Sequence, residues 1–200
     1  MRKQFGTVLV ILFLFSSTAF AEEIPKMFNM DLREAGSSHI QLSPYGGVFI
    51  GDTISTSYIT GLQAAYRWSH HFATAIDFGY SPMQVDAASA YGSTVTDPHF
   101  YNVSGSLMAI LPAAVKVGHH KILEMDLYGQ VGGGWLRINK SNLPNGLLGL
   151  GALLYLKPPW FALRMEARSY IYKLPIARGG LSVDGTFLIG PTFLFDPAVF

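Results

Sequence analysis

Residues 160–172 alternate strictly between two kinds of side chain, and this pattern limits the folds that the chain can adopt. One face is apolar, and the other carries Arg164, Glu166 and Arg168 in a row. A period of two predicts a β-strand, because successive side chains of a strand point to opposite faces of its sheet. A soluble β-sandwich would turn the charged face to water. A transmembrane β-barrel would instead enclose the charges and leave the apolar face in lipid.

Composition favours the membrane barrel. Only 14% of the 200 residues are charged and 50% are hydrophobic, while glycine (21 residues) and aromatic residues (14%) are abundant. Soluble domains contain about 25% charged residues. The formal net charge of +1 gives no reason to expect a nucleic acid partner. The absence of cysteine excludes disulfide bonds and thiolate chemistry.

The N-terminus has the features of a secretory signal peptide. Arg2 and Lys3 precede an unbroken apolar run at residues 8–15, and Ala19-Phe20-Ala21 fits the small-x-small cleavage pattern. This run is shorter than the about 20 residues of a transmembrane helix. No later segment offers 18 consecutive apolar residues, so the chain can span a membrane only as a closed barrel. We predict a signal peptide at residues 1–21, a short periplasmic arm at 22–37, the barrel at 38–195 and a C-terminal tail at 196–200.

Eight segments between turn signals have the pattern or the composition of β-strands. They span residues 39–51, 58–68, 72–80, 100–111, 122–136, 147–156, 160–172 and 186–195. Their number and length predict an all-β fold, an eight-stranded antiparallel up-and-down barrel integral to the outer membrane of a Gram-negative cell. Short connections alternate with longer ones at residues 81–99, 139–146 and 173–184. This alternation predicts short periplasmic turns, longer outer loops and both chain ends in the periplasm.

Two further features of the strands concern aromatic residues and proline. Aromatic side chains lie near the predicted strand ends, where a membrane barrel has its interfacial girdles. Pro191 and Pro44 conflict with a closed barrel, because proline cannot donate to the strand ladder. We therefore expect a bulge at Pro191 or a shorter last strand. The predicted girdle residues are Tyr58, Trp68, Phe72, Tyr80, Trp135, Trp160 and Tyr172.

The inward faces of the predicted strands carry a charge network. An eight-stranded barrel is only wide enough for side chains to fill it, and an unpaired buried charge costs several kcal/mol. We therefore predict a salt-bridged plug and not an aqueous pore, in which Arg164 and Arg168 pair with acids of other strands. A structural role for this network is preferred to a proton or ion path. The predicted network contains Arg67, Asp77, Glu124, Asp126, Arg164, Glu166 and Arg168.

Two blocks of sequence resemble a known family. The first is Gln41-Leu42-Ser43-Pro44-Tyr45-Gly46-Gly47, followed by Gly51-Asp52, Gly61-Leu62 and Tyr66-Arg67. The second is Gly149-Leu150-Gly151 with Tyr155-Leu156, Trp160, Ala162-Leu163-Arg164, Glu166 and Arg168-Ser169-Tyr170. Both are similar to the outer membrane β-barrel domain proteins of Myxococcus- and Bdellovibrio-type bacteria. The resemblance implies a barrel and supplies no catalytic residues. Some members of the family are linked to gliding-motility machinery.

Three other interpretations of the sequence stay open. A membrane-embedded hydrolase acting on lipid A would need a nucleophile and a base, for which His99, Ser104 and Ser106 are the candidates. A soluble, periplasmic lipocalin-like carrier would need the apolar faces inside and Arg164 in water. The pairs His70-His71 and His119-His120 could bind a metal only if they faced each other, and adjacent residues of an extended chain point apart.

We therefore expect a non-enzymatic barrel without cofactor or metal, acting as a structural or surface-interaction component of the cell envelope. Its expected partners are outer membrane lipids, the barrel-assembly machinery and an envelope protein that contacts the outer loops, above all residues 81–99.

Overall fold

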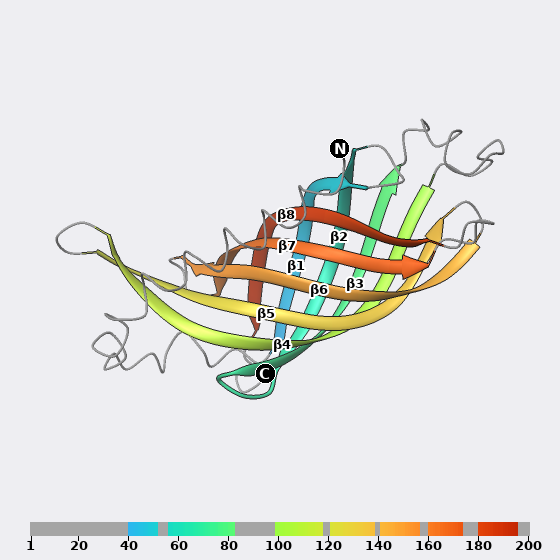
Figure 1. Cartoon of the computed structure of the whole chain (residues 1–200). Helices are drawn as coiled ribbons and strands as arrows, with labels where there is room; N and C mark the ends of the chain where they lie inside the picture. Colours follow the sequence, from blue (N-terminus) through green and yellow to red (C-terminus); the bar gives the residue numbers. More distant parts are fainter. Residues whose placement is uncertain are drawn as a thin grey trace, which may run out of the picture. The chain divides into compact units, whose positions relative to one another are not determined.

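The computed structural model describes residues 40–51, 56–82, 99–117, 121–138, 141–156, 160–173 and 180–195. Eight strands pair antiparallel with their neighbours in sequence, and the first also pairs with the last, so the sheet closes into a barrel (Figure 1). This confirms the predicted fold. The predicted signal peptide, periplasmic arm and tail lie outside the described residues. The strands are β1 (Ile40–Ile50), β2 (Ser57–Arg67), β3 (Phe72–Pro82), β4 (His99–Val117), β5 (Lys121–Ile138), β6 (Ser141–Tyr155), β7 (Phe161–Lys173) and β8 (Leu181–Phe195).

No helix in the described part of the chain has the length and apolar character needed to cross a membrane.

The pairing register fixes the stagger and hence the width of the barrel. Directly paired residues lead from Ile40 through all the other strands and back to Ile50, a shift of ten positions along β1. With a strand spacing of about 4.8 Å and a rise of about 3.3 Å per residue, this stagger gives a strand tilt of about 40° and a backbone radius of about 8 Å. A cylinder of that radius is only wide enough for side chains to fill it.

The connections differ between the two ends of the barrel. One end has the short connections at 68–71, 118–120 and 156–160, and there Ile40 pairs with Phe195. The other end has the connections at 51–56, 83–98, 139–140 and 174–180, three of which are longer than any at the first end. Short turns lie on the periplasmic side of outer membrane barrels. We therefore call the end with Ile40 and Phe195 the inner rim and the opposite end the outer rim.

Two strands begin earlier than the sequence predicts, and both errors come from residues that resemble turn signals. β6 starts at Ser141, so most of the predicted loop at 139–146 is strand. Pro144 pairs with Trp135, and the following Asn and Gly also pair with β5. β8 starts at Leu181, although residues 173–184 were predicted to form a loop. Pairing with a neighbouring strand overrides local preference in these segments.

The fourth strand continues beyond its predicted end near Pro112. It reaches Val117 and stays paired with β5 along this extension. The last pair between β3 and β4 is Phe72 with Ala109, so Pro112 has a partner strand on one side only. Edge positions tolerate a residue that lacks a backbone donor, which explains why proline does not end the strand.

Pro44 and Pro191 meet at the seam where β1 closes on β8. The ladder stops after Leu42 with Phe193 and resumes at Gly46 with Ile189 in the same register, which sets the two prolines opposite each other. Both missing donors therefore fall in a single gap. The side chains of Ser43 and Thr192 bridge this gap with a hydrogen bond of 2.8 Å between Oγ and Oγ1. The predicted bulge or shortened last strand is wrong.

Side chains alternate across the barrel wall with the polarity expected in lipid. Leu163 and Met165 face outward on β7, whereas Arg164 and Glu166 are 3% and 2% exposed on the inner side. The lipocalin-like interpretation required the opposite arrangement and is wrong. Large apolar side chains cover the outer wall, among them Ile76, Leu107, Val131, Leu148, Leu150 and Phe187.

Aromatic residues gather at both rims of the outer wall. Near the inner rim, Trp68 stacks on Phe72 with ring centroids 5.5 Å apart, and Trp160 stacks on Phe193 at 6.3 Å. Tyr172, predicted for the girdle, is instead 2% exposed and points into the barrel. It shares the parity of the inward-facing Tyr170, which decides its direction. Tyr58 and Trp135 are exposed at the outer rim, where Tyr80 is half-buried.

Candidate functional site

Glu166 lies at the centre of the barrel interior and is surrounded by four donors. Arg164 Nε donates to Oε2 at 2.9 Å and the Tyr128 hydroxyl donates to the same oxygen at 2.7 Å. Arg168 Nε and Gln130 Nε2 donate to Oε1. Charge-assisted hydrogen bonds are stronger than neutral ones, so two guanidinium groups and two neutral donors hold this carboxylate in place.

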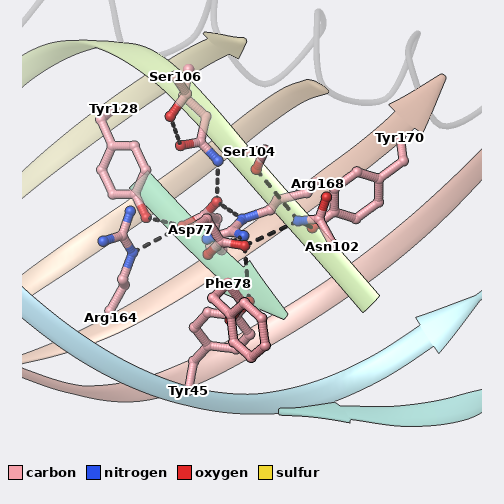
Figure 2. Close-up of polar contacts among 12 residues, drawn as sticks. Tyr45, Asp77, Phe78, Asn102, Ser104, Ser106, Tyr128, Arg164, Arg168 and Tyr170 are labelled. Atoms are coloured by element: carbon pink, nitrogen blue, oxygen red, sulfur yellow. Dashed lines mark hydrogen bonds and ion pairs between the residues drawn. The ribbon is translucent and has the colours of Figure 1, made fainter. Parts of the chain in front are cut away.

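Arg168 joins Glu166 to a second carboxylate, that of Asp77 on β3. Arg168 Nη1 lies 2.7 Å from Asp77 Oδ2. Asp77 Oδ1 accepts hydrogen bonds from the Tyr45 hydroxyl at 3.0 Å and from Asn102 Nδ2 at 3.2 Å. Figure 2 shows Tyr45, Asp77, Asn102 and Arg168 reaching one another from separate strands. With Arg164, the cluster holds two positive and two negative groups and has no net charge.

Two guanidinium groups of this cluster also lie over aromatic rings. Arg164 Cζ is 4.9 Å from the centroid of the Tyr128 ring, and Arg168 Cζ is 5.1 Å from that of Tyr45. A desolvated cation over a ring gains about 2 kcal/mol. We call Tyr45, Asp77, Asn102, Tyr128, Gln130, Arg164, Glu166 and Arg168 the central network.

A separate ion pair lies nearer the inner rim. Arg67 Nη1 donates to Asp126 Oδ2 at 2.5 Å, and the Tyr155 hydroxyl donates to the same oxygen at 2.5 Å. Arg67 Nη2 also donates to the carbonyl of His70 at 2.6 Å, which ties the pair to the β2–β3 turn. This second pair links β2, β5 and β6 across the interior.

A tyrosine donates to each buried carboxylate in the described part of the chain. Tyr45 binds Asp77, Tyr155 binds Asp126 and Tyr128 binds Glu166. Tyr172 binds Asp184, which is 0% exposed. A phenol supplies a donor on a long rigid arm without adding charge. Tyrosine therefore donates hydrogen bonds to the buried acids across the narrow barrel. Arginine in its place would add a positive charge at each site and would not keep the charge balanced.

Small residues make room for these rings. A Cβ added to Gly61 would lie 2.3 Å from the Tyr45 hydroxyl, and one added to Gly151 would lie 2.3 Å from that of Tyr128. The two glycines belong to strands β2 and β6 and face inward. The absence of a side chain at these positions lets the tyrosines lie across the barrel.

The interior near the outer rim is apolar. Phe49 and Phe100 are each 1% exposed, with ring centroids 4.9 Å apart, and Phe100 meets the ring of Tyr170 at 6.4 Å. We call the buried apolar side chains of this half the outer plug. They come from six strands and lie above the central network. The outer plug consists of Phe49, Ile59, Phe100, Leu136, Ile138, Leu143, Leu147 and Leu188.

The structure brings some of the predicted network together and leaves one member out. Arg168 lies beside Asp77 as expected, but Arg164 pairs with Glu166 of its own strand and Asp126 pairs with Arg67. Glu124 is only half-buried and makes no ion pair with the described residues, so its predicted pairing with the arginines is wrong.

The predicted interior lacked several residues that the structure places there. The outer plug, Tyr45, Asn102, Tyr155 and the Asp184 pair were missed. The signal was present in the parity: Leu136 and Ile138 continue the inward series of Tyr128 and Gln130. Tyr155 lies within the predicted strand at 147–156 and shares the inward parity of Leu147 and Leu153. Asp184 was hidden by the predicted loop at 173–184.

The candidate hydrolase residues do not form a catalytic arrangement. His99 lies on the outward face of β4, where its Nδ1 is 3.0 Å from the Tyr80 hydroxyl. Ser104 and Ser106 lie on the inward face, and Ser106 Oγ donates to Gln130. A base and a nucleophile must be within hydrogen-bond reach, which opposite faces of one strand do not allow.

The histidine pairs give no ligand set in the described part of the chain. His70 and His71 lie in the β2–β3 connection, and no group of three or more metal-ligating residues occurs among the described positions. His119 and His120 lie outside the described residues.

The closed sheet, the apolar outer wall and the buried charges of the interior together define the class of the protein. It is an integral β-barrel of the outer membrane, because its strands pair into a closed sheet and the exposed surface is suited to lipid.

Comparisons with known proteins find solved β-barrel structures that are similar to this chain. No protein-family model and no curated protein match the chain. Neisserial surface protein A is similar at 15% identity and a TM-score of 0.47, over 79% of this chain and 98% of that one. The outer membrane protein AlkL has 10% identity and a TM-score of 0.46, over 81% and 92%. Ail, the attachment invasion locus protein of Yersinia pestis, has 14% identity and a TM-score of 0.34, over 80% and 99%.

Proposed function

We propose that the protein is a sealed, non-enzymatic barrel that acts as a structural or surface-interaction component of the cell envelope. The observation that carries this proposal is the presence of two sets of buried side chains inside the barrel. Paired charges of the central network lie in the middle, and apolar side chains of the outer plug lie in the outer half. A barrel closed in this way offers no water-filled path, so its contacts with other molecules are made by its rims and outer wall.

The outer loops are the proposed contact surface for an envelope protein. The connection at residues 83–98 is the longest one at the outer rim and leaves the barrel from the directly paired Pro82 and His99. Its own conformation lies outside the described residues. Loops mounted on a rigid scaffold are where binding residues concentrate, and the filled interior provides that rigidity.

Membership in the outer membrane β-barrel domain proteins of Myxococcus- and Bdellovibrio-type bacteria is part of the same proposal. It is supported by the sequence blocks at Gly149-Leu150-Gly151 and around Arg164. In that case an envelope or motility complex is the natural setting for the partner. The barrel-assembly machinery would insert the chain into the membrane.

Two measurements test the proposed function. The folded protein in planar lipid bilayers should give no stepwise ion conductance, with a porin as the positive control; stable open channels would refute the sealed interior. Lipid A from cells with and without the gene should have the same mass spectrum, and a consistent loss of acyl groups only when the gene is present would reveal an enzyme.

A third measurement tests the contact surface. The chain is isolated from cross-linked native membranes, and its co-purified proteins are compared with those of a variant whose residues 83–98 are replaced by a Gly-Ser linker of equal length. A matched control replaces residues 52–55 at the same rim. The proposal expects a partner to be lost only in the first variant. Equal recovery of every partner from all three chains would refute it.

A further inference from the structure

A groove lies on the outer wall near the outer rim, between β3 and β6. It has a volume of about 420 Å³ and is lined by Phe78, Tyr101, Val103, Trp135, Arg137 and Asn142. All six side chains face outward, on the surface that meets lipid, so the groove is separate from the central network.

The groove consists of an apolar row and a polar row, which the strand register sets side by side. Phe78 pairs with Val103, and Val103 pairs with Trp135. One outward position nearer the rim, Tyr101 pairs with Arg137, and Arg137 pairs with Asn142. An amphipathic molecule that lies along the wall would place its apolar part on the first row and its polar part on the second.

Arg137 lies at the height of the lipid headgroups. Met125 and Trp135 are ten positions apart on the outward face of β5. At a tilt of about 40° each residue rises about 2.5 Å along the barrel axis, so this stretch covers about 25 Å, the height of the apolar band. Arg137 stands about 5 Å farther out by the same rise. An aromatic residue at the boundary with a cation just above it is typical of an interfacial anchor.

Arg137 is exposed and makes no ion pair with the described residues. Its planar guanidinium group matches the geometry of a phosphate, to which it can donate two parallel hydrogen bonds. Tyr101 and Asn142 are the residues paired directly with Arg137 on the two neighbouring strands, and each has a polar group in its side chain. Tyr101 also contacts two further rings beyond the groove: its ring lies 5.3 Å from that of Tyr80 and 6.3 Å from that of His99.

We propose that this groove binds the phosphorylated headgroup of a lipid in the outer leaflet. Arg137 holds the phosphate, Tyr101 and Asn142 supply further hydrogen bonds, and an acyl chain lies along Phe78, Val103 and Trp135. The apolar row favours a lipid over a free phosphate ion, because an ion leaves that row uncovered. The inference rests on the membrane assignment in the proposed function.

Trp135 provides a local probe for the test. The chain has three tryptophans, and Trp135 is the one that remains in a Trp68→Phe, Trp160→Phe variant. The full-length protein is folded into phosphatidylcholine vesicles, and quenching of Trp135 fluorescence is compared between dibrominated phosphatidate and dibrominated phosphatidylcholine. The proposal expects phosphatidate to be preferred about fivefold, the ratio that corresponds to about 1 kcal/mol per cation near an anionic headgroup.

Two charge variants decide whether the site is responsible. Arg137→Gln should reduce the preference to about one. Lys173→Gln removes the same charge from the outer end of β7, outside the groove, and should leave the preference unchanged. A preference that persists in Arg137→Gln, or that is lost equally in both variants, would overturn the proposal, as would no preference in the parent protein.

Two further measurements separate a failure of membrane insertion from a failure of lipid binding, and a lipid ligand from a free phosphate ion. Heat-modifiable migration on a gel reports insertion, so a chain that fails to insert contradicts the proposed function, whereas an inserted chain without preference contradicts only the lipid site. An excess of inorganic phosphate should not reduce the quenching by phosphatidate. If it abolishes the preference, the site binds free phosphate and the assignment to a lipid is wrong.

Discussion

Replacing Glu166 by Gln should destabilise the barrel strongly. The substitution keeps the size of the side chain but removes its charge and turns one acceptor oxygen into an NH₂ group. In the protein each carboxylate oxygen accepts two hydrogen bonds, one of them from an arginine. Whichever way the new amide points, the two groups that donated to one carboxylate oxygen then face its NH₂ group, which is itself a donor. Arg168 retains Asp77, but Arg164 loses its only ion pair among the described residues.

The magnitude follows from the burial of these groups. Arg164 and Glu166 are 3% and 2% exposed, so solvent compensates little of the loss. Removing one partner of a buried ion pair costs about 3–5 kcal/mol because the remaining charge is left uncompensated. Removing both charges is much less harmful. The double variant Arg164→Met, Glu166→Gln should therefore recover at least half of the loss.

The assay is urea-induced unfolding in lipid vesicles, followed by tryptophan fluorescence, with the free energy taken at unchanged m-value. Glu124→Gln is the matched control, because Glu124 is half-buried and has no ion pair with the described residues. It should change the free energy of unfolding by less than about 1 kcal/mol. Equal effects of the two substitutions, or a loss below about 1 kcal/mol for Glu166→Gln, would refute the argument that paired interior charges hold the barrel together.

Three further outcomes follow from the packing. Gly61→Ala should destabilise by about 1–3 kcal/mol in the same urea titration, because its Cβ would overlap the Tyr45 hydroxyl, while Gly105→Ala, whose nearest neighbour would lie 3.9 Å away, should be nearly neutral. Ile76→Arg, on the outer wall, should cost about 2–4 kcal/mol in vesicles, and a neutral result would argue against contact with lipid. Tyr172→Phe should cost about 1–3 kcal/mol by leaving Asp184 without its phenol donor, and Tyr58→Phe, exposed at the outer rim, should have no measurable effect.

The number of strands and the direction of most side chains could be predicted because a period of two needs no knowledge of neighbours. Residues 160–172 show this most clearly: each charge predicted to face inward does so. The prediction failed where local signals oppose pairing. Residues 141–146 resemble a loop, yet each of them pairs with β5, and the ladder continues through Pro144.

The contacts of the interior could not be predicted in the same way. Arg67 meets Asp126 three strands away, and this pairing depends on the stagger of ten positions that appears only when the barrel closes. The same stagger brings the outer plug together from six strands. Sequence parity identifies which residues face inward, whereas the closed register determines which of them meet.

The inversion of polarity across the wall is the central claim, and site-directed spin labelling on β7 tests it most directly. The chain has no cysteine, so Leu163→Cys, Met165→Cys and Ala167→Cys each give a single labelling site in the full-length protein. In lipid vesicles, the labels should collide readily with oxygen, which dissolves in the bilayer, and rarely with a water-soluble nickel chelate. Labels that favour the nickel chelate, or that are shielded from both reagents, would contradict an apolar wall facing lipid.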